Sequence, residues 1–300
     1  MNFDRLVRRL AEIDGLDIRR DLILAQHTTF RIGGPAAVAI FPAHREAALA
    51  ALAVIADVDA PLALIGNGSN LLCADAGFDG VALFTGHMKQ MGFSGTTAHV
   101  DAGVPLTAFS AEAQRHGLDG LAFGYGIPGS MGGAVRMNAG AYGGEMADVV
   151  CTSTCYDLQT RTVHTITDHA FAYRQSIYAA HPERVILSVD LALREGDAAA
   201  IAAQMQDFMQ RRRDKQPLEW PNAGSVFKRP VGYFAGKLIE DCGLKGRQIG
   251  GAQVSEKHAG FIINRGNATA DDVRKLIEVI QATVLSAFGV SLECELIYLG

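Results

Sequence analysis

The chain is poor in cysteine and tryptophan and has no long apolar run. Its 300 residues include five cysteines and one tryptophan. No Cys-x-x-Cys pair or Cys/His ligand spacing occurs, so we expect neither a bound metal nor a disulfide framework. Cys73, Cys151 and Cys294 stand among apolar neighbours and are expected to be buried. The longest apolar run, residues 47–56, falls short of the roughly 18 residues that a membrane-spanning helix needs, so no membrane insertion is expected.

Strong positive charge is also lacking. The net charge is −5, and the densest basic cluster, residues 211–213, falls at a predicted helix end, where a solvated face is the simplest interpretation. A nucleic-acid partner is therefore not expected. Residues 1–9 contain no apolar core of the kind found in signal peptides, which predicts a cytoplasmic protein. The length and the 49% hydrophobic content predict two or three subdomains with well-filled cores.

Glycine, by contrast, is concentrated in one segment. Residues 126–144 (GIPGSMGGAVRMNAGAYGG) hold seven glycines and one charged residue. Glycine loses more backbone freedom on folding than any other residue, so such a run indicates that bare backbone is needed there. Main-chain N–H groups that approach a phosphate or a flat ring would explain it, with Ser130 and Asn138 supplying polar atoms. The alternative is a set of glycine turns between strands.

A second glycine-rich loop follows a short apolar run. Residues 61–65 (PLALI) indicate a buried strand that leads into residues 66–72 (GNGSNLL). The loop lacks the Gly-Lys-Ser/Thr ending of a P-loop. Leu71 stands where the dinucleotide fingerprint has its third glycine, and no long helix is expected to begin there. The pattern therefore predicts a pyrophosphate held by backbone amides outside both motifs.

The predicted elements divide the chain near residue 195. Short strands dominate before it, at residues 63–66, 80–84, 98–101, 149–156, 161–166 and 184–193, with a helix at 105–116 that ends before Gly117. After it, residues 197–214 form a predicted helix. A final helix is capped by Thr269 and Asp272, carries a stripe of Val273, Leu276, Ile277, Ile280 and Val284, and ends at Gly289. Residues 194–197 are the predicted boundary, and no internal repeat occurs.

Eight segments in order along the chain resemble one family. They are residues 27–36 (HTTFRIGGPA), 66–72, 126–144, 172–176 (AYRQS), 222–228 (NAGSVFK), 235–240 (AGKLIE), 254–261 (VSEKHAGF) and 292–296 (LECEL). Along nearly its whole length the chain resembles the UDP-N-acetylenolpyruvoylglucosamine reductases, also called UDP-N-acetylmuramate dehydrogenases, which are flavoenzymes of bacterial peptidoglycan precursor synthesis.

The resemblance implies an α+β fold. A domain of the FAD-binding p-cresol methylhydroxylase or vanillyl-alcohol oxidase type would comprise two subdomains, residues 1–85 and 86–195, followed by a C-terminal α/β substrate-binding domain at 196–300. The implied reaction uses NADPH and FAD to reduce the enolpyruvyl double bond of UDP-N-acetylglucosamine enolpyruvate, giving UDP-N-acetylmuramate. NADPH would reduce FAD and leave, and the flavin N5 would then deliver hydride to the substrate, a task that no side chain performs.

Three residues carry the chemistry that the resemblance implies. Ser225 would protonate the carbon left electron-rich after hydride transfer. Arg174 would bind the enolpyruvyl carboxylate bidentately and draw charge away from the double bond. Glu295 would interact with the enol system of the substrate. Taken alone, a serine after glycine is usually a turn or a helix cap, and Glu295 alternates with Cys294 and Leu296 on a predicted terminal strand where it and Glu293 could form an exposed polar face.

The resemblance also implies binding residues. Those expected to bind FAD are Arg31, Gly33, Gly66, Asn67, Gly68, Ser69, Asn70, Leu71, Ile127, Pro128, Gly129, Ser130, Gly132, Gly133, Asn138, Ala139 and Gly140. Those expected to bind substrate are Tyr173, Lys215, Lys228, Arg229, Tyr233, Lys245 and His258, although Lys245 and His258 could equally be surface and core residues.

The chain also departs from the family pattern. Arg229 stands where asparagine is expected, and Ile297 where arginine is often found. The stretch between Arg174 and Ser225 is too short for the tyrosine-bearing insertion of the longer subtype. The shorter subtype is therefore expected, in which another segment covers the nucleotide end of the substrate.

Two other functional classes stay open at the level of sequence. A flavin-linked oxidase of an alcohol or sugar on the same fold would keep the FAD domain but would not need Ser225 and Glu295 in their present motifs. A non-catalytic nucleotide-sugar binding protein would explain the glycine loops without redox chemistry, and it would be colourless when purified.

Overall fold

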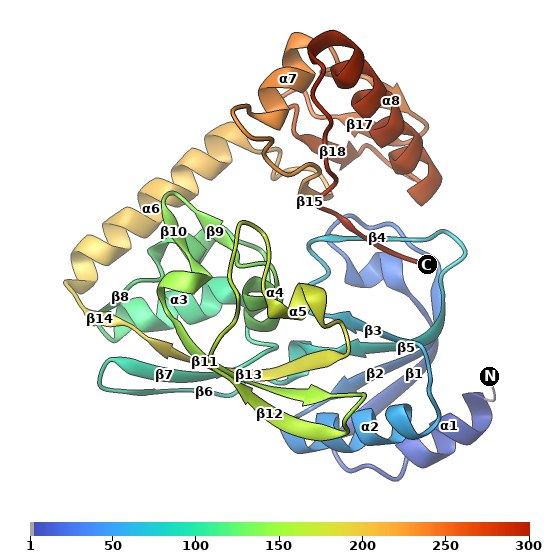
Figure 1. Cartoon of the computed structure of the whole chain (residues 1–300), viewed down its shortest axis with the longest axis vertical. Helices are drawn as coiled ribbons and strands as arrows, with labels where there is room; N and C mark the ends of the chain where they lie inside the picture. The colour runs from blue at the N-terminus through green and yellow to red at the C-terminus, as the bar shows by residue number, and fades with distance from the viewer. Residues whose placement is uncertain (1–2) are drawn as a thin grey trace. The chain divides into compact units, whose positions relative to one another are not determined.

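The chain folds into two compact units that interleave along the sequence. The computed structural model describes residues 3–300 (Figure 1); residues 1 and 2, part of the segment inspected for a signal peptide, lie outside the described residues. The first unit comprises Met1–Arg20, Ala37–Asn67 and Gly80–Gln210, and the second comprises Asp21–Ala36, Gly68–Asp79 and Arg211–Gly300. The division expected near residue 195 thus lies further along the chain, and the second unit also takes in two N-terminal segments.

Packing explains both differences. Helix α6 (Ala198–Lys215) buries Ile201, Met205 and Phe208, and these side chains form a small apolar cluster with Ala122 of the first unit. Most of the helix therefore belongs to that unit. Strand β4 (Leu71–Cys73) pairs in parallel with the last strand, β19 (Ile297–Leu299), which draws residues 68–79 into the second unit. The expected division of the FAD domain at residues 85 and 86 stays a prediction.

Two sheets form the framework of the first unit. A four-stranded sheet has the order β1 (Leu16–Ile23), β2 (Pro35–Pro42), β5 (Phe78–Phe84), β3 (Leu62–Ile65). A five-stranded antiparallel sheet has the order β12 (Thr162–Ile166), β11 (Val150–Asp157), β13 (Arg184–Ala192), β7 (Thr97–Asp101), β6 (Met91–Ser94). The strands expected from alternation and apolar runs are confirmed, including the 62–65 strand and the β11–β12 hairpin.

Helices and short elements complete this unit. The helices are α1 (Phe3–Leu10), α2 (Arg45–Asp57), α3 (Leu106–Arg115), α4 (Met131–Arg136) and α5 (Ile177–Ala180). Short strand pairs join β8 (Leu118–Asp119) to β14 (Arg194–Glu195) and β9 (Gly140–Ala141) to β10 (Gly144–Glu145). Single turns of 3-10 helix lie at η1 (Leu24–His27), η2 (Thr85–His87), η3 (Ala122–Gly126) and η4 (Met146–Asp148).

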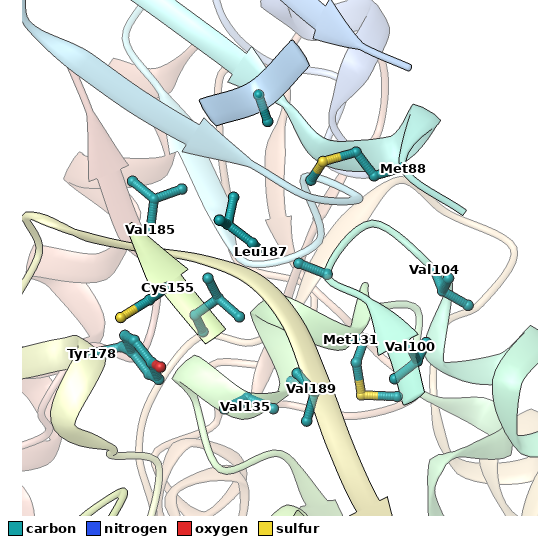
Figure 2. Close-up of a cluster of buried hydrophobic side chains, with 14 of the residues drawn as sticks. Met88, Val100, Val104, Met131, Val135, Cys155, Tyr178, Val185, Leu187 and Val189 are labelled. Atoms are coloured by element: carbon teal, nitrogen blue, oxygen red, sulfur yellow. The ribbon is translucent and has the colours of Figure 1, made fainter. Parts of the chain in front are cut away.

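The core of the first unit takes side chains from both sheets, including Val38 and Ile40 of β2 and Val81 and Leu83 of β5. Five consecutive residues of β13 are buried: Ile186 and Ser188, and also Val185, Leu187 and Val189. Figure 2 shows Val185, Leu187 and Val189 with residues of β7, β11, α4 and α5, and places Tyr178 beside Cys155. Cys151, expected to be buried, is exposed instead. It lies at a register shift between Val150 and Thr152, where the β11–β13 ladder has no partner for it.

The second unit is built on an antiparallel sheet with the order β15 (Asn222–Ser225), β18 (Phe261–Asn264), β17 (Ala252–Val254), β16 (Gln248–Ile249). Helices α7 (Ala235–Asp241) and α8 (Ala270–Phe288) bury their apolar sides against it. The predicted capping of α8 is confirmed, since Thr269 and Asp272 form a capping box and Gly289 ends the helix with a left-handed φ of 67°. Four residues of the predicted stripe are buried and Ile277 is partly buried.

A second carboxylate also caps α8, and it comes from the connection between β4 and β5. The N–H of Ala270 donates to Asp75 Oδ1 at 2.8 Å, and the N–H of Asp271 donates to Oδ2 at 3.2 Å. We expect Asp75→Ala to lower the free energy of unfolding by about 0.5–2 kcal/mol, because these donors lose their acceptor. Urea unfolding of the purified protein measures this. Asp79→Ala, which removes an exposed carboxylate from the adjoining strand β5, is the control, and equal losses in both variants would contradict the capping role.

Candidate active site

The NAGS motif places Ser225 at the end of β15. The N–H of Gly224 donates to Asn222 Oδ1 at 2.9 Å, and Gly224 adopts a left-handed φ of 81° that favours glycine. A register shift against β18 separates Asn222 from Ser225. Such a bulge re-aims the side chains that follow it. The motif therefore sets the direction in which the Ser225 side chain points. This role goes beyond the ordinary turn or helix cap that a lone serine suggests.

Glu295 lies on a chain segment that is antiparallel to the one after Ser225. The Glu295 N–H donates to the carbonyl of Val226 at 2.7 Å, and Phe227 and Cys294 form an antiparallel bridge. The structure thus brings Ser225 and Glu295, which are 70 positions apart in the numbering, onto neighbouring backbone segments. The expected terminal strand is shorter than predicted, since β19 begins at Ile297.

Asn70 forms hydrogen bonds with the backbone of Glu295 and Ile297. The Asn70 side-chain N–H donates to the Glu295 carbonyl at 3.1 Å, while the Asn70 carbonyl accepts from the Ile297 N–H at 3.0 Å. Asn70 was expected among the cofactor-binding residues, but its side chain is used to hold the backbone of Glu295. The sequence contained no local signal for this long-range contact beyond the presence of Asn70 in a matching segment.

His258 and Gly260 line the surroundings of the Ser225 hydroxyl. A Cβ built on Gly260 would lie 3.4 Å from Ser225 Oγ and 3.1 Å from His258 Nδ1. The Gly260 N–H donates to His258 Nδ1 at 3.0 Å, so a neutral ring carries its proton on Nε2. Burial lowers the pKa of His258, and Lys245 and Lys215 lower it further against a backbone hydrogen bond that raises it. A neutral imidazole therefore lies beside Ser225 at neutral pH.

The other expected substrate residues of the second unit carry charge or aromatic surface. Lys228 pairs with Glu293, and Lys245 pairs with Glu240 at 2.7 Å. The Arg229 guanidinium lies over the Phe234 ring at 4.0 Å, in a segment where Tyr233 and Phe234 are exposed. Lys215 ends α6. These five expected residues and His258 thus belong to the same unit as Ser225 and Glu295, whereas Tyr173 belongs to the first unit.

The start of the first glycine loop packs against the second within the first unit. The Asn67 side chain donates to the Pro128 carbonyl at 3.1 Å. A Cβ on Gly66 would overlap Ser130 Oγ. Ser130, which is 2% exposed, caps α4 by accepting from the Gly133 N–H at 3.3 Å. The two loops that were expected to share a ligand are therefore in contact here.

Several glycines of the long run serve the protein's own packing. A Cβ on Gly132 would lie 2.9 Å from Ala102 Cβ, and one on Gly140 would lie 2.8 Å from Glu145 Cβ. The Asn138 side chain, 1% exposed, donates to the Ala172 carbonyl at 3.2 Å and accepts from the Ala147 N–H at 3.0 Å. These contacts support in part the alternative interpretation of the run as a set of glycine turns. Asn138, for its part, joins two segments of the protein.

The Gly66–Leu71 loop retains backbone donors that the protein does not use. Among residues 3–300, no protein acceptor lies within hydrogen-bond range of the N–H groups of Asn67, Gly68 and Ser69. Gly68 has a left-handed φ of 60°, and a Cβ there would lie 2.5 Å from the His27 carbonyl. Consecutive free N–H groups around a left-handed residue form an anion-binding concavity. The loop therefore fits a pyrophosphate.

Two expected cofactor residues precede this loop in the second unit. Arg31 has a φ of 56°, and Gly33 has a φ of 133° with no room for a Cβ, which would lie 2.5 Å from Cys73 Cβ. Thr29 ties their segment to the NAGS motif, because its hydroxyl donates to the Asn222 carbonyl at 2.7 Å. Thr29 and Asn222 lie in segments that resemble the family, but no sequence pattern predicts that they bond to each other.

Arg174 sits at the tip of a tight turn of the first unit. Ala172 and Gln175 exchange two main-chain hydrogen bonds of 3.1 and 3.0 Å, which close a turn around Tyr173 and Arg174. The guanidinium lies over the Tyr173 ring at 5.2 Å and donates to the Gly140 carbonyl at 3.3 Å. The turn thus presents an arginine and a half-exposed tyrosine next to the glycine run.

Residues 3–300 contain neither a helix able to cross a membrane nor a cluster of side chains able to hold a metal ion. None of the helices between residues 3 and 300 has the length and apolar composition that a membrane crossing needs. In the same part of the chain, no group of three or more His, Cys, Asp and Glu side chains is placed to hold a metal ion.

Family models match both halves of the chain. Residues 35–166 match an FAD binding domain, and residues 216–299 match the C-terminal domain of UDP-N-acetylenolpyruvoylglucosamine reductase. The chain is 40% identical to the UDP-N-acetylenolpyruvoylglucosamine reductase of Clostridium novyi over 96% of its length and 94% of the relative, and 42% identical to that of Geobacillus kaustophilus over 99% and 98%. The crystal structure of the enzyme from Thermus caldophilus superposes with a TM-score of 0.81 at 33% identity, covering 95% of this chain and all of the other. The fold class expected from the sequence is confirmed.

Proposed function

The chain belongs to the UDP-N-acetylenolpyruvoylglucosamine reductase family, and from this we propose that it uses NADPH and FAD to reduce UDP-N-acetylglucosamine enolpyruvate to UDP-N-acetylmuramate. The observation that carries the proposal is the pairing of Ser225 and Glu295 on neighbouring segments, fixed by the 2.7 Å bond from the Glu295 N–H to the Val226 carbonyl. A proton donor and a carboxylate on neighbouring backbone segments suit a reaction in which one carbon gains a proton as negative charge develops next to it.

FAD fits the residues that are present. The free N–H groups of Asn67, Gly68 and Ser69 would hold its pyrophosphate, and the loop of residues 126–133 would line the site. When bound, FAD supplies the hydride that the methylene carbon of the enolpyruvyl group receives, having taken it from NADPH. Carboxylate binding, stabilisation of the enol and protonation depend on side chains of the protein.

Each catalytic side chain has a separate task in this proposal. Arg174 binds the substrate carboxylate and draws electron density from the double bond, which makes the methylene carbon more electrophilic. Glu295 forms a hydrogen bond to the enol system that develops at the carboxylate-bearing carbon. Ser225 then gives its proton to that carbon, which completes the lactyl ether, and the hydroxyl regains a proton from solvent.

The nucleotide end of the substrate needs cations and aromatic surface. Our candidates for this end are Lys215, Tyr233, Lys245 and His258, and our further candidates for binding the substrate are Lys228, Arg229 and Tyr173. The lysines and Arg229 supply positive charge, and Tyr233 and Tyr173 present exposed rings. The cytoplasm is the proposed location, as the sequence predicts.

The proposal is tested by incubating the purified protein with UDP-N-acetylglucosamine enolpyruvate and NADPH, with NADH in a parallel reaction. We expect a yellow protein, NADPH consumption that depends on the nucleotide sugar, and a product heavier by two hydrogen atoms in the mass spectrum. Oxygen consumption with sugars alone would support the oxidase alternative instead. A colourless protein that binds the nucleotide sugar without converting it would support the binding-protein alternative.

A further inference from the structure

The turn that carries Arg174 holds its backbone in a strained conformation. Arg174 has a φ of 55°, in the left-handed region that glycine and asparagine favour. For other residues that conformation costs roughly 1–2 kcal/mol, so it persists only where the surroundings enforce it. The contacts that enforce it are therefore contacts that position the guanidinium.

Hydrogen bonds tie this turn to the end of α4 and the residues that follow. The Asn138 side chain donates to the Ala172 carbonyl at 3.2 Å, and the Ser176 hydroxyl donates to the Arg136 carbonyl at 2.7 Å. One bond thus lies just before Arg174 in the chain and the other just after it. Asn138 is 1% exposed and Ser176 is 4% exposed, so these bonds are shielded from water.

A buried chain of three side chains lies behind the turn. Ser153 on β11 bonds Tyr178 Oη at 2.6 Å and His169 Nε2 at 2.7 Å. Ser153 and Tyr178 are fully buried and His169 is 4% exposed. Burial lowers the pKa of His169 and raises the pKa of Tyr178, so both are neutral at neutral pH.

These three hydrogen-bonded side chains join the two ends of the loop formed by residues 169–178. His169 precedes Arg174, Tyr178 follows it, and Ser153 links the two across the loop. The Ile177 N–H also donates to the His169 carbonyl at 2.7 Å. The Arg136 guanidinium donates to the Tyr178 carbonyl at 2.6 Å. Figure 2 shows the Tyr178 ring within the buried cluster of β11, β13 and α4, where it cannot move without disturbing the core.

We propose that Tyr178, bonded through Ser153 to His169, is a positioning residue that holds the Arg174 turn in the conformation that binds the substrate carboxylate. The inference rests on the proposed function, in which Arg174 binds that carboxylate. It assigns a catalytic consequence to three buried side chains that do not themselves contact substrate.

Tyr178→Phe tests the proposal, because it removes one hydroxyl, keeps the ring in the core and leaves Ser153 bonded to His169. We expect recovery of the flavin absorbance on addition of UDP-N-acetylglucosamine enolpyruvate to slow about fivefold to tenfold and the KM for this substrate to rise, the effect of losing one buried hydrogen bond of about 1 kcal/mol. NADPH-driven bleaching should stay near the parent rate, and the urea midpoint should fall only slightly, because one buried hydrogen bond is lost from the folded state. The control is Tyr156→Phe, the same change at a buried tyrosine of β11.

A double-mutant cycle with Arg174→Lys separates positioning from general stability. If Tyr178 acts through Arg174, Tyr178→Phe has no further effect in the Arg174→Lys background. Independent, multiplicative effects would overturn the proposal, as would a Tyr178→Phe enzyme identical to the parent. If Tyr178→Phe does not fold, Ser153→Ala, which removes both bonds of Ser153, is tested in the same cycle. Should Arg174→Lys itself leave the substrate step unchanged, the fault lies with the assignment of Arg174 in the proposed function.

Discussion

Ser225→Ala is expected to leave the NADPH-driven bleaching of the flavin near the parent rate and to slow the substrate-driven recovery of absorbance by roughly 10²- to 10⁴-fold, the usual effect of losing a general acid. Flavin bleaching needs no proton from this residue, whereas completion of the lactyl ether does. Stopped-flow absorbance under anaerobic conditions separates the two half-reactions.

Two further variants make the Ser225 result specific. Ser225→Cys keeps a proton donor at about the same place and should recover part of the lost rate. Ser286→Ala, at an exposed serine of α8, should change neither half-reaction. If Ser225→Ala slows bleaching and leaves recovery intact, the serine belongs to the NADPH site or to the structure of the NAGS turn, and its assigned role is wrong.

Arg174→Lys is expected to slow the same substrate-driven recovery by roughly 10²-fold or more. Lysine keeps the charge but loses the planar fork that binds a carboxylate bidentately, so both orientation and charge withdrawal suffer. Stopped-flow recovery at several substrate concentrations gives the rate and the apparent affinity separately.

The chain offers a matched control for this variant. Arg161 is another arginine of the first unit with a left-handed φ, 58°, and it pairs with Asp57 at 2.9 Å. Arg161→Lys makes the same chemical change in a similar backbone conformation, and both half-reactions should be unaffected. Unchanged substrate turnover in Arg174→Lys would move carboxylate binding to another residue.

Local patterns predicted the elements of this fold well. The apolar run at 62–65 is β3, and the Thr269, Asp272 and Gly289 signals mark the ends of α8 correctly. These predictions succeed because capping and alternation are properties of neighbouring residues. The pairing of strands that are distant in the sequence was harder to predict. The parallel pairing of β4 with β19 joins segments more than two hundred residues apart, and neither short strand signals its partner.

The candidate site shows the same contrast between local patterns, which the sequence predicts, and contacts between distant segments, which it does not. Motifs led to Ser225, Glu295 and Arg174, but not to the contacts that hold them. The Asn70 bond to the Glu295 carbonyl and the Thr29 bond to the Asn222 carbonyl depend on packing between distant segments. The left-handed backbone of Arg174 is equally absent from the sequence, because arginine has no preference for that conformation and the buried Ser153 chain supplies the constraint.

The most direct test of the central claim is an anaerobic double-mixing experiment on the unmodified protein. NADPH is mixed first, and UDP-N-acetylglucosamine enolpyruvate follows once the flavin band has bleached. If the chain catalyses the proposed reaction, the band bleaches in the first step and returns in the second, in proportion to the UDP-N-acetylmuramate formed. A flavin that stays bleached after the nucleotide sugar is added, and regains its colour only when oxygen is admitted, would contradict that proposal.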